Sequence, residues 1–273
     1  MTDPRSDFTD LFCAPRALIG MLHAGALPGT AHAREPLDAI VERAVSEAKI
    51  YRDAGFNALL LENMHDRPYL NGAVGPEIVA SMTAIAREVR RAVSLPLGIQ
   101  VLAAANREAL AVALASGASF VRVEGFAFAH VADEGIIEAS AGPLLRYRRA
   151  IGAEQVRVFA DIKKKHSAHA ITADVSLAET ARAAEFFSAD GVIVTGAATG
   201  APAAPADVDA VRDGATLPVL VGSGVTPENM RLYARAHGFI VGSSVKRGGR
   251  WSNALDPEAV RAVAAAFEAL PAS

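Results

Sequence analysis

The chain has 273 residues, of which 51% are hydrophobic and 21% charged, and its formal net charge is −3. That charge excludes a global basic field for nucleic acid or anionic membranes, and the length suits one large α/β domain. The single cysteine, Cys13, excludes an intrachain disulfide, and no apolar run is long enough to cross a bilayer, so we expect a cytoplasmic protein without membrane insertion.

Short runs rich in Val, Ile and Leu alternate with longer Ala-, Glu- and Arg-rich runs of helical spacing. The polar, acidic start is no secretory signal, so residues 1–16 are expected to be a short extension with a frayed beginning. The predicted strands are Ala17–His23, Ala58–Asn63, Leu97–Leu102, Phe120–Gly125, Val156–Lys163, Gly191–Thr195, Pro218–Gly222 and Gly238–Gly242. The predicted helices are Leu37–Ala54, Pro76–Val93, Arg107–Ser116, Pro143–Ile151, Leu177–Phe187, Pro205–Arg212, Pro227–Ala236 and Pro257–Leu270.

Eight strand–helix pairs therefore follow one another without a linker or a change of composition. Strict alternation predicts a parallel sheet, and eight units in about 250 residues match a closed barrel better than an open sheet. A doubly wound sheet is the alternative, but no G-x-G-x-x-G opens the first turn. We predict a single (β/α)8 TIM barrel over residues 1–273.

The ends of the predicted strands carry polar side chains, although the strands are otherwise apolar. In this fold the carboxyl ends of the strands form the active-site face, and buried polar groups are costly unless they are satisfied. A bound ligand explains such convergence better than chance. The candidates are His23, Glu62, Asn63, Gln100, Arg122, Glu124, Asp161, Lys163 and Thr195.

The last two predicted strands end in glycine-rich turns, Gly222-Ser223-Gly224 and Gly242-Ser243-Ser244, which we call the glycine rim. Barrels often bind phosphate with the loops after strands seven and eight, because glycine lets backbone N–H groups approach an anion closely. Tight turns without a ligand are the alternative. The pair of turns at these two strands favours a phosphate site.

Asp161 and Lys163 lie two residues apart, so they share a face if their strand is regular to its end. A lysine beside an aspartate can bind phosphate, exchange protons or form a Schiff base. The alternative is a salt bridge on the rim with Lys164 and Lys165 solvated, and for Lys164 we favour solvation. We predict catalytic roles for Asp161 and Lys163.

Glu62 is the better general base of the pair Glu62 and Asn63, and Asn63 the better orienting group, since the two side chains point to opposite faces. His23 and Glu124 are further catalytic candidates. Gln100, Arg122 and Thr195 are predicted to bind ligand, as is Asn63; an internal ion pair of Arg122 with Glu124 is the alternative.

No cofactor is required by any motif. His23, Glu62, Glu124 and Asp161 offer donors for a divalent metal, but no local spacing supports a metal site. Two segments are candidates for covering a ligand, Phe126–Ala141 and Gly196–Pro205. Trp251 is left open between a cap on the barrel, a stacking surface for a ligand and an interface.

Several stretches resemble the BtpA/SgcQ family from about Ala17 to Arg261. They are LIGMLHAGALPG, LLLENMHDRPY, MTAIAREVRRAVSLPLGIQVL, VRVEGFAFAHVADEG, FADIKKKHSAHA, VIVTGAATG, VLVGSGVTPEN and VGSSVKRGGRWSNALDPE. Other members have an Asn-Val-His type of sequence where this chain has Glu124-Gly125-Phe126. The resemblance implies a barrel similar to the ribulose-phosphate-binding barrels. The family name is associated with photosystem I biogenesis, and the resemblance implies no catalytic set.

Three functions stay open. The first is an enzyme, an isomerase, lyase or hydrolase, acting on a phosphorylated sugar or nucleotide-derived small molecule. The second is a non-catalytic biogenesis or assembly factor for a protein complex. The third is a ligand-binding regulator or self-associating barrel. We favour the enzyme, with a phosphorylated small molecule and further copies of the chain as the expected partners and no nucleic acid among them.

Overall fold

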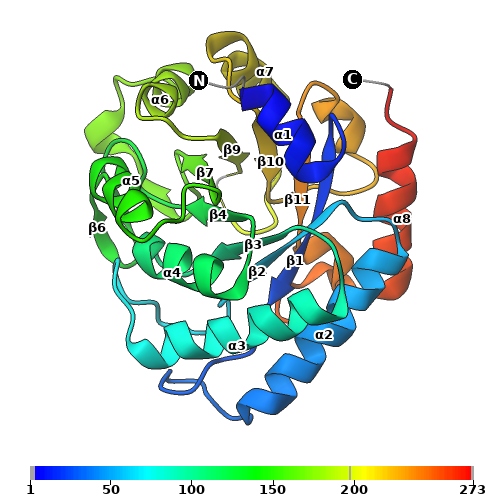
Figure 1. The fold of residues 1–273 in the computed structure, drawn as a ribbon. Helices are drawn as coiled ribbons and strands as arrows, with labels where there is room; N and C mark the ends of the chain where they lie inside the picture. The colour runs from blue at the N-terminus through cyan, green and yellow to red at the C-terminus, as the bar shows by residue number, and fades with distance from the viewer. Residues whose placement is uncertain (1–3, 197, 272–273) are drawn as a thin grey trace.

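The computed structural model describes residues 4–196 and 198–271. Eight parallel strands close into a barrel in the order β1-β11-β10-β9-β7-β4-β3-β2, which confirms the predicted architecture (Figure 1). The barrel strands are β1 (Ala17–His23), β2 (Ala58–Glu62), β3 (Leu97–Gln100), β4 (Phe120–Val123), β7 (Arg157–Ile162), β9 (Gly191–Thr195), β10 (Val219–Gly222) and β11 (Gly238–Val241). The helices are α1 (Pro4–Phe12), α2 (Leu37–Asp53), α3 (Pro76–Ala92), α4 (Asn106–Ser116), α5 (Ala141–Ala150), α6 (Leu177–Phe186), α7 (Pro205–Gly214) and α8 (Pro257–Glu268).

The strands bury both faces, as their continuous apolar sequences predict. Outward-facing side chains form one large core with the helices. Inward-facing side chains fill the part of the barrel nearer the beginnings of the strands with a second apolar cluster. This cluster includes Ile19, Leu60, Ile193, Leu220 and Ile240. The next inward positions toward the strand ends are polar, so the barrel interior changes from apolar to charged along its axis.

The helix α1, drawn in dark blue in Figure 1, closes the end of the barrel at which the strands begin. Phe8 and Phe12 are 3% and 2% exposed and pack their rings against Phe159 and Phe120 inside the barrel. Asp7 adds an ion pair to Arg157, at 3.0 Å. The expectation of a frayed start is therefore wrong for residues 4–12, because two aromatic rings on one helical face anchor the segment.

Replacing Phe12 with alanine should lower the free energy of unfolding by about 3–5 kcal/mol, since it removes a buried ring and leaves a cavity. Urea unfolding measures the change. Phe186→Ala is the matched control, because Phe186 is 82% exposed and its loss should change stability by less than about 0.5 kcal/mol. Equal effects of the two substitutions would show that α1 does not seal the barrel.

One predicted helix is wrong, and one long connection contains strands. The segment predicted as the helix Pro227–Ala236 contains only a short 3-10 helix, η2 (Met230–Tyr233), because the Asn229 side chain bonds Thr226 and Gly224 and folds the chain into a turn. Phe126–Ala141 contains strands β5 (His130–Ala132) and β6 (Gly135–Ile137), which join β8 (Ser167–Ala168) in a small antiparallel sheet. Within the described residues, no helix is long and apolar enough to span a membrane.

Candidate active site

The polar layer at the strand ends lies inside the barrel. Alternation along the strands, with their parallel register, turns one residue of each strand end inward. The polar ones among these inward residues are His23, Glu62, Gln100, Arg122, Asp161 and Thr195, and Glu124 follows β4 two residues after Arg122. Of the predicted site residues, His23, Glu62 and Arg122 line one cavity at the strand ends.

Arg122 and Asp161 form the centre of this layer. The Arg122 guanidinium donates from Nε and Nη2 to the Asp161 carboxylate at 3.0 Å, and the two side chains are 5% and 2% exposed. Burial raises the pKa of Asp161, while the charge of Arg122 opposes that rise. The alternative of an internal ion pair between Arg122 and Glu124 is therefore wrong, because Arg122 pairs with Asp161.

Glu62 lies beside His23, with Oε2 at 3.6 Å from Nε2. His23 donates from Nδ1 to the Trp251 carbonyl, at 3.2 Å, which leaves Nε2 as an acceptor. Burial and the charge of Lys246 lower the pKa of His23 to about 3, so its imidazole is neutral. Burial raises the pKa of Glu62, and the charges of Lys165 and Arg122 oppose that rise.

The three lysines after β7 diverge. Lys163 has a φ of 49°, which ends the strand alternation, and its Nζ donates to the Thr172 carbonyl at 3.4 Å. The expectation that Lys163 shares a face with Asp161 at the barrel opening assumed a strand that is regular to residue 163, whereas β7 ends at Ile162. Lys165, which the alternation did not single out, lines the cavity at the opening instead.

Lys164 is buried, so its predicted solvation is wrong. Its Nζ donates to Glu124 Oε2 at 3.1 Å, and Glu124 also accepts from the backbone N–H of Ala104. Asn63 points away from the opening: it accepts from the Leu102 N–H at 2.7 Å and donates to Asp66 at 2.8 Å. Glu124 and Asn63 thus hold neighbouring loops in place.

Lys165 lies between the acids of the layer. Burial and the charge of Arg122 lower its pKa, while Glu62 and Asp161 oppose that change. Lys165 and Glu62 line the same cavity. A carboxyl with a raised pKa and an amine with a lowered pKa are a pair suited to proton transfer.

The glycine rim forms the wall opposite these groups. Gly224, Gly242, Ser243 and Ser244 line the cavity. Ser223 and Gly224 have consecutive positive φ values of 85° and 64°, so the chain turns sharply directly after β10. A Cβ at Gly224 would collide with the backbone of Ala201, so this position requires glycine.

Part of the loop after β9 lies beside the rim, and the prediction that Gly196–Pro205 covers a ligand stays a prediction. Thr199 and Gly200 line the cavity, and the Gly200 N–H donates to Ser223 Oγ at 3.2 Å. His166 Nε2 accepts from the Thr199 N–H at 3.0 Å. This contact joins the loops that follow β7 and β9 on one side of the opening.

An apolar wall adjoins the same opening. Met64, Leu102 and Ala103 form a small buried cluster, against which Tyr69 and Trp251 pack. Those five residues line a cavity together with Glu62 and Lys165, so the charged layer is continuous with an aromatic surface. Of the alternatives for Trp251, the structure shows a side chain that packs at the barrel opening.

Two buried polar atoms of the layer, Gln100 Oε1 and Thr195 Oγ1, have no hydrogen-bond partner within the described chain. Such atoms are costly to bury. Across residues 4–196 and 198–271, no three His, Cys, Asp or Glu side chains are grouped to hold a metal.

Acid should destabilise the protein through its buried histidines. Burial and Lys164 lower the pKa of His130 to about 4, below the unfolded value near 6.5, so its contribution to stability is present above pH 6.5 and is lost as the pH falls through 4. By pH 5 the loss is about 2 kcal/mol. Urea unfolding of His130→Gln should show a pH dependence between 7 and 5 that is flatter by that amount. His32→Gln, at an exposed position, should follow the wild type.

Comparison with solved structures shows the same fold. The chain superimposes on phosphoribosyl anthranilate isomerase from Thermus thermophilus with a TM-score of 0.58 and 14% identity, covering 93% of this chain and 100% of that one. Thiamine phosphate pyrophosphorylase from Pyrococcus furiosus gives a TM-score of 0.56 and 14% identity, covering 93% and 96%. At this identity the likeness concerns the barrel architecture.

Sequence relatives match nearly the whole chain. A Caenorhabditis elegans protein described as uncharacterized and mitochondrial is 49% identical over 245 residues, 88% of each chain. The photosystem I biogenesis protein BtpA of Synechocystis is 36% identical over 258 residues, 94% of this chain and 89% of its own length. Residues 14–269 match the model of the BtpA family. The chain belongs to the BtpA family.

Proposed function

We propose that this barrel is an enzyme that acts on a phosphorylated sugar or a related small molecule at the carboxyl ends of its strands. The observation that carries the proposal is the placement of Glu62 and Lys165, with oppositely shifted pKa values, in the cavity that the glycine rim borders. The rim would hold the phosphate, and the apolar wall would contact the remainder of the molecule.

The chemistry that fits is proton transfer beside a carbonyl. A protonated Glu62 can donate to an oxygen of the substrate, and a neutral Lys165 amine can accept a proton or attack a carbonyl carbon. Arg122 would supply positive charge near a developing oxyanion while it stays paired to Asp161. Isomerase and lyase reactions both use these steps. The two solved structures with phosphorylated compounds in their names are consistent with this substrate class.

The test is to find the substrate directly. The protein would be incubated with a panel of sugar phosphates and with extract metabolites, and conversion followed by mass spectrometry and ¹H NMR. Solvent deuterium appearing beside a carbonyl of one phosphorylated compound is the expected result. A panel that is unchanged by wild-type protein, together with no phosphate binding at the rim, would contradict the proposal.

Replacing Gly224 with alanine should weaken binding of inorganic phosphate at least 10-fold, because the new Cβ pushes against Ala201 and displaces the rim. Isothermal titration calorimetry measures the dissociation constant. Gly117→Ala is the matched control: Gly117 ends α4 with a φ of 75°, a Cβ there meets open space, and phosphate affinity should stay at the wild-type value. Equal phosphate affinities in the two variants would show that phosphate does not bind at the glycine rim.

The name of the Synechocystis relative favours a second candidate, a biogenesis factor for a protein complex. Complementation separates the two. If a strain lacking its own relative is rescued by the wild type but not by Glu62→Gln, the pocket carries the function; rescue by Glu62→Gln would favour the assembly role. Cytoplasmic location and homo-oligomerisation stay predictions from the sequence.

A further inference from the structure

A second cavity of about 350 Å³ opens beside the barrel opening, and we call it the side pocket. Its walls come from the loop between β1 and α2, from α2 itself, and from the loops after β2 and β11. His23 lines both the side pocket and the cavity at the glycine rim, and Trp251 lines both the side pocket and the apolar wall. The side pocket is therefore contiguous with the candidate active site.

The side pocket has an excess of positive charge in a chain that is acidic overall. Four cationic side chains line it against two carboxylates, a local net charge of +2 with neutral histidines. The pairs account for part of this: Arg43 binds Glu35, and the buried Lys246 ammonium binds Glu47 at 2.9 Å. Within the described chain, Arg34 and Arg67 have no carboxylate partner.

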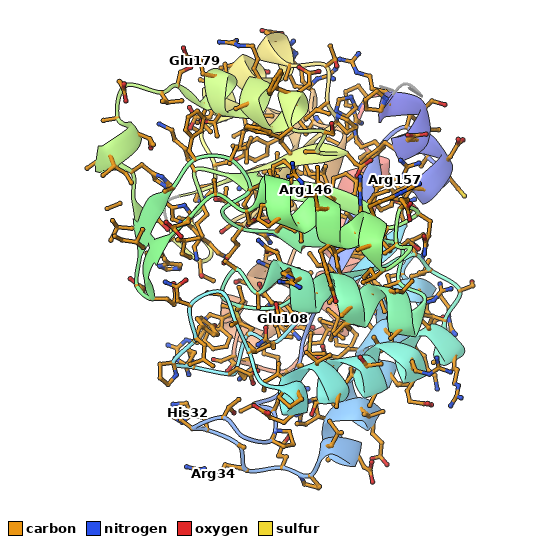
Figure 2. All side chains as sticks on the ribbon, turned by 60° about the vertical axis from the view of Figure 1, so that its left-hand side comes forward. His32, Arg34, Glu108, Arg146, Arg157 and Glu179 are labelled. Atoms are coloured by element: carbon orange, nitrogen blue, oxygen red, sulfur yellow. The ribbon has the colours of Figure 1, made fainter. Side chains whose placement is uncertain are left out.

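These two arginines stand on separate loops around the pocket. Figure 2 shows Arg34, with His32, on the loop that leads into α2, with their side chains projecting from the molecule. Arg67 comes from the loop after β2, and its guanidinium stacks on the Trp251 ring at 4.9 Å. That stacking orients the guanidinium, whose remaining N–H donors suit a phosphate or carboxylate.

The pKa of His65 responds to the charged side chains that line the side pocket. Its ring lies 4.9 Å from Trp251. Burial lowers its pKa, and the charges of Arg43, Arg67 and Lys246 lower it further, against the weaker effect of Glu35. Three cations therefore act on one half-buried group, and an anion in the pocket would relieve their mutual repulsion.

We propose that the side pocket binds a second anionic group of the same small molecule whose phosphate lies at the glycine rim. This inference rests on the proposed function and narrows the substrate class to compounds with two anionic ends, one of them a phosphate. His23 lies between the two anion sites, so the reacting part of the molecule would pass over His23 and Glu62. The second group is a phosphate or a carboxylate, because a guanidinium binds both with paired hydrogen bonds.

The test compares ligands with one and two anionic ends by isothermal titration calorimetry. The probes are ribulose 5-phosphate, ribulose 1,5-bisphosphate and 6-phosphogluconate. The wild type should bind one of the last two at least 10-fold more tightly than the monophosphate, and which one gains identifies phosphate or carboxylate. The exposed double variant Arg34→Ala/Arg67→Ala should lose that gain while binding the monophosphate within about 2-fold of wild type. No gain in the wild type, or a gain that persists in the double variant, overturns the proposal.

A second measurement separates this inference from the proposed function. ¹H NMR titration of the His65 ring in Gly224→Ala, with and without inorganic phosphate, reports the side pocket alone. Phosphate should raise the pKa of His65, and adding Arg34→Ala/Arg67→Ala should abolish the effect. If phosphate leaves the pKa of His65 unchanged, the proposed anion site in the side pocket is wrong, even if the rim binds phosphate. A response of His65 without any phosphate at the rim of the wild type contradicts the proposed function and overturns the ligand with two anionic ends, although it shows that the side pocket binds an anion.

Discussion

Lys165→Met should reduce kcat for the phosphorylated substrate by about 10²–10⁴-fold, the usual contribution of a positioned acid or base. Lys165 lines the cavity with Glu62, and burial lowers its pKa, a change that favours proton exchange by its amine. Methionine keeps the length of the side chain and removes the amine. Rates from the mass-spectrometric assay measure the effect.

Lys163→Met is the matched control two residues away. Lys163 contacts the Thr172 carbonyl and lies outside the cavity at the glycine rim, so its loss should change kcat by less than about 3-fold. If Lys163→Met were the inactive variant and Lys165→Met the active one, the assignment of Lys165 would be wrong. Thermal denaturation of both variants checks that the fold is unchanged.

Arg122→Met should lower the free energy of unfolding by about 3–5 kcal/mol, because it leaves the Asp161 carboxylate buried without its cation. The pKa of Asp161 is already raised by burial, and the substitution should raise it further. The deficit should therefore be larger at pH 8 than at pH 5, since protonation of Asp161 at low pH removes the unpaired charge. Urea unfolding at both pH values measures it.

Arg149→Met removes a cation from an exposed pair with Glu154 and should cost less than about 1 kcal/mol at either pH. The double variant Arg122→Met/Asp161→Leu should recover most of the stability that Arg122→Met loses, because no buried charge is left. A double variant as unstable as Arg122→Met alone would mean that the cavity left by the guanidinium, and not the carboxylate, causes the loss.

The barrel was predictable because its signals are local and repeated. Apolar runs followed by helical runs recur along the chain, and the polar residues at the strand ends marked Glu62, Arg122 and Asp161 as candidates for the site. The glycine turns were predictable for the same reason, since each directly follows a strand. Their role in binding phosphate is still a prediction.

The remaining parts depend on contacts or backbone angles that the pattern does not encode. A positive φ at Lys163 moves the next inward-facing lysine to position 165, and nothing in Lys-Lys-Lys-His marks where that change falls. Lys164 was expected in solvent because its partner, Glu124, is 40 residues away in the sequence. The helix α1 is short and polar on average, and only the barrel end that receives Phe8 and Phe12 explains its order.

The seal that α1 forms makes the barrel a dead end. A molecule cannot pass along the barrel axis, because the end at which the strands begin is filled by the rings of Phe8, Phe12, Phe120 and Phe159. Under the proposed function, substrate would enter and product would leave at the carboxyl ends of the strands, where Thr199 lines the cavity. A substitution that narrows this opening would then slow substrate binding and product release together, without changing the rate of the chemical step.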